Sequence, residues 1–134
     1  MNDLTKKFEQ AGRSEAAQKL RSAFDPVIRR TLLNGFSRAQ ADEGTLWIAD
    51  SQATKLLPVF NSGPEGTEFV ANVEQPLDRG VVSMVYHSGQ PFCENEVFKN
   101  STHDHTIDDA LGQVTAAMIA VPLFFAYHTR GVIS

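Results

Sequence analysis

The 134-residue sequence contains a single cysteine, Cys93, so no internal disulfide can form. It has no apolar run near the roughly twenty residues of a transmembrane helix, and no secretory start with a basic, an apolar and a small-residue region. The G-x-S-x-G and H-E-x-x-H motifs and the phosphate-binding Walker loop are also missing. These absences predict a cytoplasmic protein that does not insert into a membrane, and they disfavour hydrolytic activity.

The net charge of −4 is distributed unevenly along the chain. Up to residue 41 there are eight Lys and Arg against four Asp and Glu, whereas the remainder has four against twelve. A basic front is one feature of nucleic-acid-binding proteins. Here, however, the basic residues are spread through a helical pattern with few aromatic residues among them. We therefore expect a solvated helix surface and no nucleic-acid partner.

The first part of the chain is predicted to be helical. Residues 1–24 form an N-terminal helical segment rich in Ala, Leu, Lys, Gln and Glu. A second helix is predicted within residues 24–41, with Asp25 as its N-cap and Pro26 at its first position. The apolar positions of this helix recur at helical spacing and share one face: Ile28, Leu32, Phe36 and Ala39.

From residue 44 the pattern changes to that of strands. The runs GTLWIAD and KLLPVFNS predict an antiparallel hairpin, in which Pro58 indicates an edge strand or a bend. The following SGPEGTE is predicted to be an exposed loop. PLDRGVVSMVYHSGQPF predicts a short helix with Asp78 as N-cap and Gly89 as its end. Its buried face is predicted to consist of three valines: Val81, Val82 and Val85.

The last third of the sequence contains further strands and one polar segment. FCENEVF alternates and predicts a strand, and IDDALG predicts about one helical turn. Residues 114–134 predict a closing hairpin. Helices and antiparallel strands in this order predict an α+β domain, with helices packed against an antiparallel sheet.

Three pieces of the sequence, in this order, resemble the GAF domain, a small-molecule sensory module of signalling proteins: GTLWIAD…KLLPVFNSGP, PLDRGVVSMVYHSGQPFCENEV and IDDALGQVTAAMIAVPL…RGVIS. The resemblance covers roughly residues 25–134. It implies a GAF-like antiparallel sheet with a covering layer of loops and helices. In GAF domains the last strand runs on and a helix follows, so the resemblance predicts a GAF-like domain in residues 25–134 that lacks its last strand and helix.

The resemblance also implies a ligand pocket between the sheet and the segments that cover it. The residues implied as its lining are Trp47, Phe60, Arg79, Val82, Tyr86, His103, His105, Thr106, Asp109 and Thr115. Arg79 could meet an anionic ligand and Thr115 could offer a hydroxyl. Each has an ordinary alternative, because Arg79 also fits a solvated first turn and Thr115 fits a strand. Trp47 and Phe60 are equally suited to the core.

Cys93 and the histidines are the remaining chemical candidates. Cys93 lies beside Glu94 in a strand-like run, where a small buried apolar residue is the ordinary interpretation. GAF-type methionine sulfoxide reductases use several cysteines, and bilin-binding members attach the bilin at a cysteine before the AVPL strand, where this chain has none. His103 and His105 have no second cluster at metal-ligand spacing. We predict no cofactor, no metal site and no enzymatic activity.

Three classes of function are consistent with these features. The first is a regulatory domain that binds a small molecule and signals to an attached output domain. The second is a ligand-free GAF-like scaffold that forms homodimers through its N-terminal helices, using the apolar face from Ile28 to Ala39. A metal- or haem-binding sensor is a third, less favoured class. We expect the first, in a protein that is dimeric.

Overall fold

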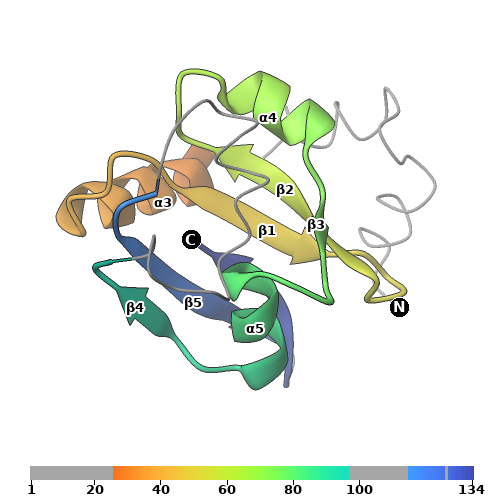
Figure 1. Ribbon diagram of the computed structural model, residues 1–134. Helices are drawn as coiled ribbons and strands as arrows, with labels where there is room; N and C mark the ends of the chain where they lie inside the picture. Colours follow the sequence, from red (N-terminus) through yellow and green to blue (C-terminus); the bar gives the residue numbers. More distant parts are fainter. Residues whose placement is uncertain (1–25, 97–114, 126) are drawn as a thin grey trace.

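The computed structural model describes residues 26–96, 115–125 and 127–134. In this part of the chain six strands form a sheet in the order β3-β2-β1-β6-β5-β4, with every neighbouring pair antiparallel. The helices are α3 (Pro26–Arg38), α4 (Gly66–Asn72) and α5 (Val81–Ser88). The strands are β1 (Thr45–Ala49), β2 (Lys55–Asn61), β3 (Gln75–Pro76), β4 (Phe92–Glu94), β5 (Met118–Phe125) and β6 (His128–Ile133). The predicted α+β architecture is confirmed (Figure 1).

Both predicted hairpins are present. β1 pairs with β2 and β5 pairs with β6, and β6 also pairs with β1 at the centre of the sheet. Gly131 allows this central contact, because a Cβ atom at this position would lie 2.0 Å from the Trp47 carbonyl oxygen. The predicted bend near Pro58 is a bulge, since Leu46 pairs with Phe60 but Trp47 pairs with Pro58.

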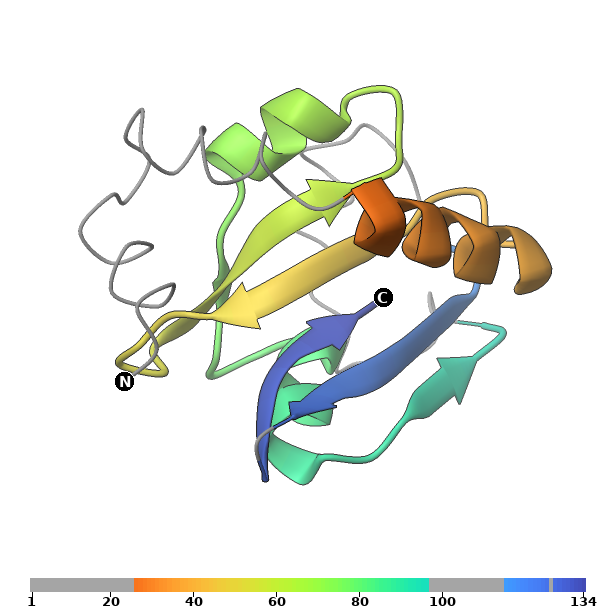
Figure 2. The same ribbon diagram turned by 180° about the vertical axis from the view of Figure 1, so that it is seen from behind.

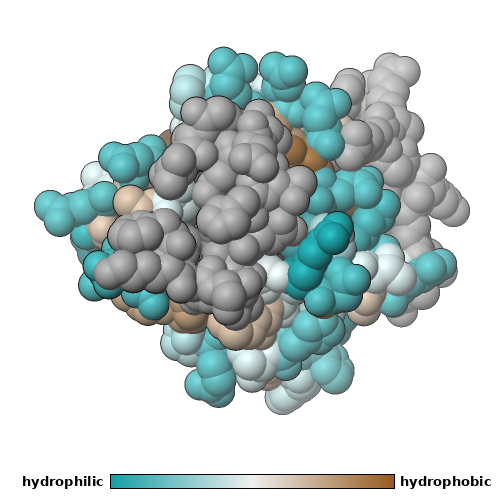
Figure 3. Space-filling view, viewed as in Figure 1, coloured by the Kyte–Doolittle hydropathy of each residue, from teal (hydrophilic) through white to brown (hydrophobic). Residues whose placement is uncertain are grey.

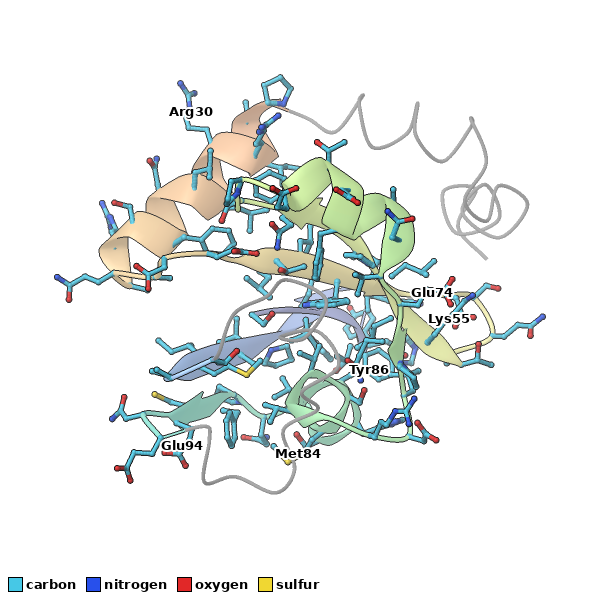
Figure 4. The ribbon with its side chains drawn as sticks, turned by 45° about the horizontal axis from the view of Figure 1, so that its top comes forward. Arg30, Lys55, Glu74, Met84, Tyr86 and Glu94 are labelled. Carbon is cyan, nitrogen blue, oxygen red and sulfur yellow. The ribbon has the colours of Figure 1, made fainter. Side chains whose placement is uncertain are left out.

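The inner face of the sheet carries the larger core. Trp47 of β1 and Leu56 of β2 are buried there, together with Val132 of β6 and Ala120 of β5. α4 packs on β2, and α5 packs on β5 and β6 (Figure 1). Beside this layer, Lys55 and Glu74 point toward each other, with 3.1 Å between the ammonium nitrogen and the carboxylate (Figure 4). This ion pair is exposed, so it contributes little to stability.

The outer face of the sheet carries α3 and a smaller cluster. Half-buried Leu32 and Phe36 of α3 pack against buried Leu46 and Phe60. Viewed from behind, α3 lies across one part of the sheet and leaves the outer face of β5 and β4 uncovered among the described segments (Figure 2). α3 is described from Pro26 and contains Gly35 without a break, but it ends at Arg38, so Ala39 lies beyond it. None of its side chains is fully buried.

Two local predictions are wrong. SGPEGTE is not entirely loop, because α4 begins at Gly66 and buries Phe69. Asp78 is not the N-cap of α5; Gly80 holds that position with φ 86° and ψ 161°. That φ lies in a region that side-chain-bearing residues rarely adopt, so glycine suits this entry to the helix. Gly89 ends α5 in the left-handed conformation, as predicted, and Val81, Val82 and Val85 are buried.

The last described residue remains paired in the sheet. The backbone nitrogen of Ser134 donates to the Thr45 oxygen at 3.0 Å, and the Thr45 nitrogen donates to the Ser134 oxygen at 2.7 Å. The predicted segment 1–24, the Asp25 cap and the IDDALG turn lie outside the described residues. Among the helices described, none has both the length and the apolar character needed to cross a bilayer.

Candidate functional site

A cavity of about 810 Å³ lies where the inner face of the sheet, the start of α5 and the end of α3 meet. Its apolar surface comes from residues far apart in the sequence that the sheet brings together. The apolar residues on the inner side are Trp47, Phe69, Val81, Val82 and Met118. The cavity is thus built partly from core residues of β1, α4, α5 and β5.

Two aromatic rings form one wall of the cavity. Trp47 reaches the inner face because alternate residues of β1 point to opposite sides, and Leu46 points outward. Phe69 of α4 meets it edge to face, with ring centroids 5.7 Å apart and planes at 75°. This geometry is favourable for aromatic pairs, so the two rings hold each other in place.

Gln75 fixes the loop that leads into α5. Its side chain is buried, and its amide nitrogen donates to the carbonyl oxygens of Pro76 at 3.2 Å and Arg79 at 2.9 Å. The Ser83 hydroxyl donates to the same Pro76 oxygen from within α5. These bonds set the position of Gly80, which lines the cavity at the start of the helix.

The charged residues in the described lining are all acidic. Asp42 and Glu43 contribute from the segment between α3 and β1, and Glu94 contributes from β4 (Figure 4). Glu43 accepts a hydrogen bond from the Asn61 amide at 2.8 Å. No lysine, arginine or histidine lines the cavity within residues 26–96, 115–125 and 127–134. The described walls therefore favour neutral or positively charged groups over anions.

The residues predicted to line the pocket fall into three groups. Trp47, Val82 and Thr115 line the cavity together. Phe60, Arg79 and Tyr86 do not line it. His103, His105, Thr106 and Asp109 lie outside the described residues.

Each of the three residues away from the cavity has a defined position. Phe60 lies on the outer face because the bulge reverses its side, and the Arg29 guanidinium lies 5.4 Å from its ring centre. Tyr86 packs half-buried against the inner core. Arg79 is exposed, and its backbone oxygen accepts a hydrogen bond from the Gln75 amide.

The exposure of Cys93 differs from what we expected. Cys93 is exposed, whereas we expected a buried structural residue, and it lies at the cavity edge beside Glu94 and Asn95. β4 is one of the two edge strands of the described sheet. It has a strand neighbour on one side only, so its side chains are less covered than those of a central strand. Among the described residues, no three His, Cys, Asp or Glu side chains are grouped so as to hold a metal ion.

Phe69 and Gln75 belong to the site but were not among the residues predicted from the sequence. Phe69 follows a stretch containing two glycines and a proline, which favours a loop. Gln75 lies in a strand of two residues, too short for a periodic signal. The one available signal was the apolar pair Phe69-Val70 within polar surroundings.

Comparison with protein-family models and with curated proteins finds no match to this sequence. Comparison with solved structures finds similar folds. The GAF domain of an Acinetobacter phosphoenolpyruvate-protein phosphotransferase is 15% identical with a TM-score of 0.62, over 77% of this chain and 58% of that one. The corresponding domain from Coxiella burnetii is 13% identical with a TM-score of 0.69, over 96% and 76%.

A third similar structure is that of a reductase. The free methionine-R-sulfoxide reductase of Neisseria meningitidis, solved with its substrate, is 17% identical with a TM-score of 0.63, over 99% of this chain and 74% of that one. Identities this low establish the fold alone. The chain therefore has a GAF-like fold, as its sequence resemblance predicts, and this fold occurs in domains of phosphotransferases and in a methionine-R-sulfoxide reductase.

Proposed function

We propose that this GAF-like chain is a sensory or regulatory domain that binds a small molecule in the cavity beside Trp47. The observation that carries the proposal is the cavity itself. Its volume of about 810 Å³ lies within the range of small-molecule sites, roughly 300–1,000 Å³. Its lining combines apolar and aromatic walls with a few polar groups, as such sites do.

The lining supports a ligand with an apolar body and a neutral or cationic polar end. Trp47 and Phe69 offer aromatic surface, and Val82 and Met118 offer aliphatic surface. The carboxylates of Glu43 and Glu94 lie in the same lining and favour a positive charge. Arg79 does not line the cavity, so this proposal assigns it no contact with the ligand.

Ligand binding would act on α3 and α5, because residues from both helices line the cavity. Gly80 and Val81 start α5, and Leu32 and Phe36 of α3 contribute from the other side. A ligand that prefers one packing of these helices shifts the population toward it. We propose that this shift is passed to an attached output domain of a cytoplasmic signalling protein. We assign the chain no reaction of its own, since the reductases that share this fold use several cysteines and this chain has one.

Native mass spectrometry of the gently purified chain tests ligand binding directly. We expect extra mass that is lost on denaturation, and its value identifies the ligand. Val82→Phe extends a side chain into the cavity, and Met84→Phe is the matched control because Met84 is exposed on the same helix (Figure 4). The extra mass should be lost in the Val82 variant and kept in the Met84 variant. Absence of bound mass in the unmodified chain, together with no stabilisation by a panel of small organic cations and neutral metabolites, would contradict the proposal.

A second candidate function is a homodimeric scaffold that binds no ligand. The observation that favours it is that α3 exposes three apolar side chains: Val27, Ile28 and Leu33 have exposed fractions of 59%, 46% and 41%. Light scattering after size exclusion gives the mass in solution. If α3 forms the dimer, Ile28→Glu should produce a monomer, whereas Asn34→Glu at another exposed position should not. A dimer unaffected by Ile28→Glu would exclude this interface.

A further inference from the structure

One wall of the cavity changes from polar to aromatic along the chain. Glu43, Thr45 and Trp47 all contribute to the lining. Thr45 and Trp47 belong to β1 and point to the same face, because alternate residues of a strand do so. Glu43 lies in the segment that leads into the strand. A carboxylate, a hydroxyl and an indole ring therefore follow one another along this wall.

Buried Asn61 connects the carboxylate with the hydroxyl. Its amide nitrogen donates to Glu43 Oε1 at 2.8 Å and to Thr45 Oγ1 at 2.9 Å. Its amide oxygen accepts a hydrogen bond from the Gly63 backbone nitrogen at 2.8 Å, which sets the orientation of the amide group. Because both acceptors contact one nitrogen atom, the Glu43 carboxylate and the Thr45 hydroxyl lie close together.

Gly63 also positions the Glu43 carboxylate, because it has no side chain. A Cβ atom at Gly63 would lie 2.5 Å from both the carboxyl carbon and Oε2 of Glu43. The carboxylate thus occupies the space that a larger residue at position 63 would fill, and Asn61 holds it there through Oε1. Among the residues that the structure describes, none donates a hydrogen bond to Oε2. This oxygen is therefore available to a ligand.

The polar end of the wall offers a negative charge and two acceptors. Glu43 supplies Oε2, and the Thr45 hydroxyl oxygen keeps a second lone pair beside the one that Asn61 uses. In the described lining, no basic side chain balances the carboxylate. A primary ammonium group matches this end, because it carries a positive charge and three N–H donors. Hydrogen bonds between such charged groups are stronger than those between neutral ones.

We propose that the cavity selects ligands that carry a primary ammonium group on an apolar body, and that Glu43 is the residue that selects them. The ammonium group donates to Glu43 and Thr45, and the apolar body lies against the wall at Trp47. Asn61 and Gly63 are positioning residues that hold the carboxylate in place. The ligand class rests on the proposed function, since it concerns the same cavity.

Three compounds with one phenethyl body separate charge from hydrogen bonding. At pH 7 phenethylamine is a primary ammonium ion, trimethyl(phenethyl)ammonium keeps the charge without N–H donors, and phenethyl alcohol is neutral. In calorimetric titrations of the full chain, the amine should bind about tenfold or more tighter than either of the others. Trp47 is the one tryptophan of the sequence, so its fluorescence reports binding beside it. Equal or tighter binding of either other compound would overturn the proposal.

The Glu43→Gln variant tests the carboxylate itself. It keeps an oxygen that can accept the Asn61 bond, but it removes the charge. Its affinity for phenethylamine should fall about tenfold or more, whereas its affinity for phenethyl alcohol should stay within about threefold. Glu65→Gln is the matched control, because Glu65 is exposed at the start of α4 and outside the cavity lining. Figure 3 shows that the outward surface over α4 is hydrophilic. Unchanged amine binding by Glu43→Gln, or an equal loss in both variants, would contradict the role of Glu43.

The Gly63→Ala variant tests position without a change of charge. Its methyl group would displace the Glu43 carboxylate, and the backbone at Gly63 has no positive φ that alanine would strain. Affinity for phenethylamine should fall about tenfold or more in a variant that circular dichroism shows to be folded. Pro64→Ala, at the exposed neighbouring position, should keep full affinity. A folded Gly63→Ala variant with full affinity would refute the positioning of the carboxylate.

Native mass spectrometry of the purified chain separates failure of the ligand class from failure of the proposed function. A bound molecule that contains a primary amine would support both. A bound molecule without an amine would show that the cavity takes a ligand but that the ligand class is wrong. If neither a bound molecule nor binding of phenethylamine is found, both are wrong.

Discussion

Trp47 and Ser134 are joined by a hydrogen bond that spans 87 positions of the sequence, from the indole nitrogen to the Ser134 hydroxyl at 2.9 Å. Trp47 is almost fully buried, so its N–H has lost contact with water. The bond therefore ties the end of the central strand to the aromatic wall of the cavity. It also fixes the ring whose position defines the proposed ligand site.

Replacing Ser134 with alanine should destabilise the protein. The change leaves the buried indole N–H without its acceptor, which costs about 1–3 kcal/mol of unfolding free energy. Urea unfolding followed by circular dichroism measures this loss. Ser37→Ala on the exposed surface of α3 is the control and should change the unfolding free energy by under about 0.5 kcal/mol. Equal effects of the two changes would show that the indole bond contributes nothing.

Stability should depend on the ionisation of Asp50 in the turn between β1 and β2. Burial of the carboxylate raises its pKa, but hydrogen bonds from the Thr54 hydroxyl and from the Thr54 and Lys55 backbone nitrogens, with the Lys55 charge, outweigh burial. The net result is a pKa below the usual 3.8. A lowered folded-state pKa stabilises the protein above the unfolded-state pKa, and this stability is lost as the pH falls through the folded-state value.

The Asp50→Asn variant tests this linkage. Thermal unfolding between pH 2 and pH 7 should show that the unmodified chain loses more stability than the variant as the pH falls below about 4. Asp42→Asn, at an exposed position, is the comparison and should retain the acid-dependent loss. The same pH profile in the Asp50 variant and the unmodified chain would contradict the role assigned to Asp50.

The sequence predicted those elements whose signal is local. The short apolar runs in GTLWIAD and KLLPVFNS, and the glycine at position 89, placed β1, β2 and the end of α5 correctly. α4 was missed because it spans only Gly66–Asn72 and its stability comes from tertiary contact. Phe69, its one large buried side chain, packs on Trp47, which lies 22 positions earlier.

The site was harder to predict because its lining depends on the register between β1 and β2. Without the bulge, Phe60 would share the inner face with Pro58, which lies opposite Trp47. The bulge between them turns Phe60 outward, where it packs under α3. No residue type in KLLPVFNS marks this change, so the sequence does not show that Phe60 turns away from the predicted lining. Gln75 was not predicted either, because its hydrogen-bond partners are backbone carbonyl oxygens, which no residue type in the sequence marks.

Two glycines should respond to alanine in opposite directions. Gly131→Ala places a methyl group 2.0 Å from the Trp47 carbonyl oxygen, so β1 and β6 must separate and the protein should lose at least about 1 kcal/mol. Gly35→Ala meets no neighbour and lies within α3, where alanine should stabilise by about 0.5–1 kcal/mol. Chemical unfolding of both variants measures the difference. If Gly131→Ala unfolded at the same denaturant concentration as the unmodified chain, the close contact of β1 and β6 would be refuted.

Gln75→Glu should couple stability to pH at the cavity. The amide nitrogen of Gln75 donates to two carbonyl oxygens, and an ionised carboxylate in its place would repel both. A protonated carboxyl can still donate one bond, so the glutamate pKa should be raised in the folded state. The variant should therefore be most stable at pH values below the usual glutamate pKa of about 4.3. Its stability should fall as the pH rises through the higher folded-state pKa. Thermal unfolding from pH 3.5 to pH 8 measures this slope relative to the unmodified chain. Gln90→Glu, at an exposed position after α5, should show no comparable slope. A Gln75→Glu variant as stable as the unmodified chain at pH 7 would mean that these two bonds do not hold the entrance to α5.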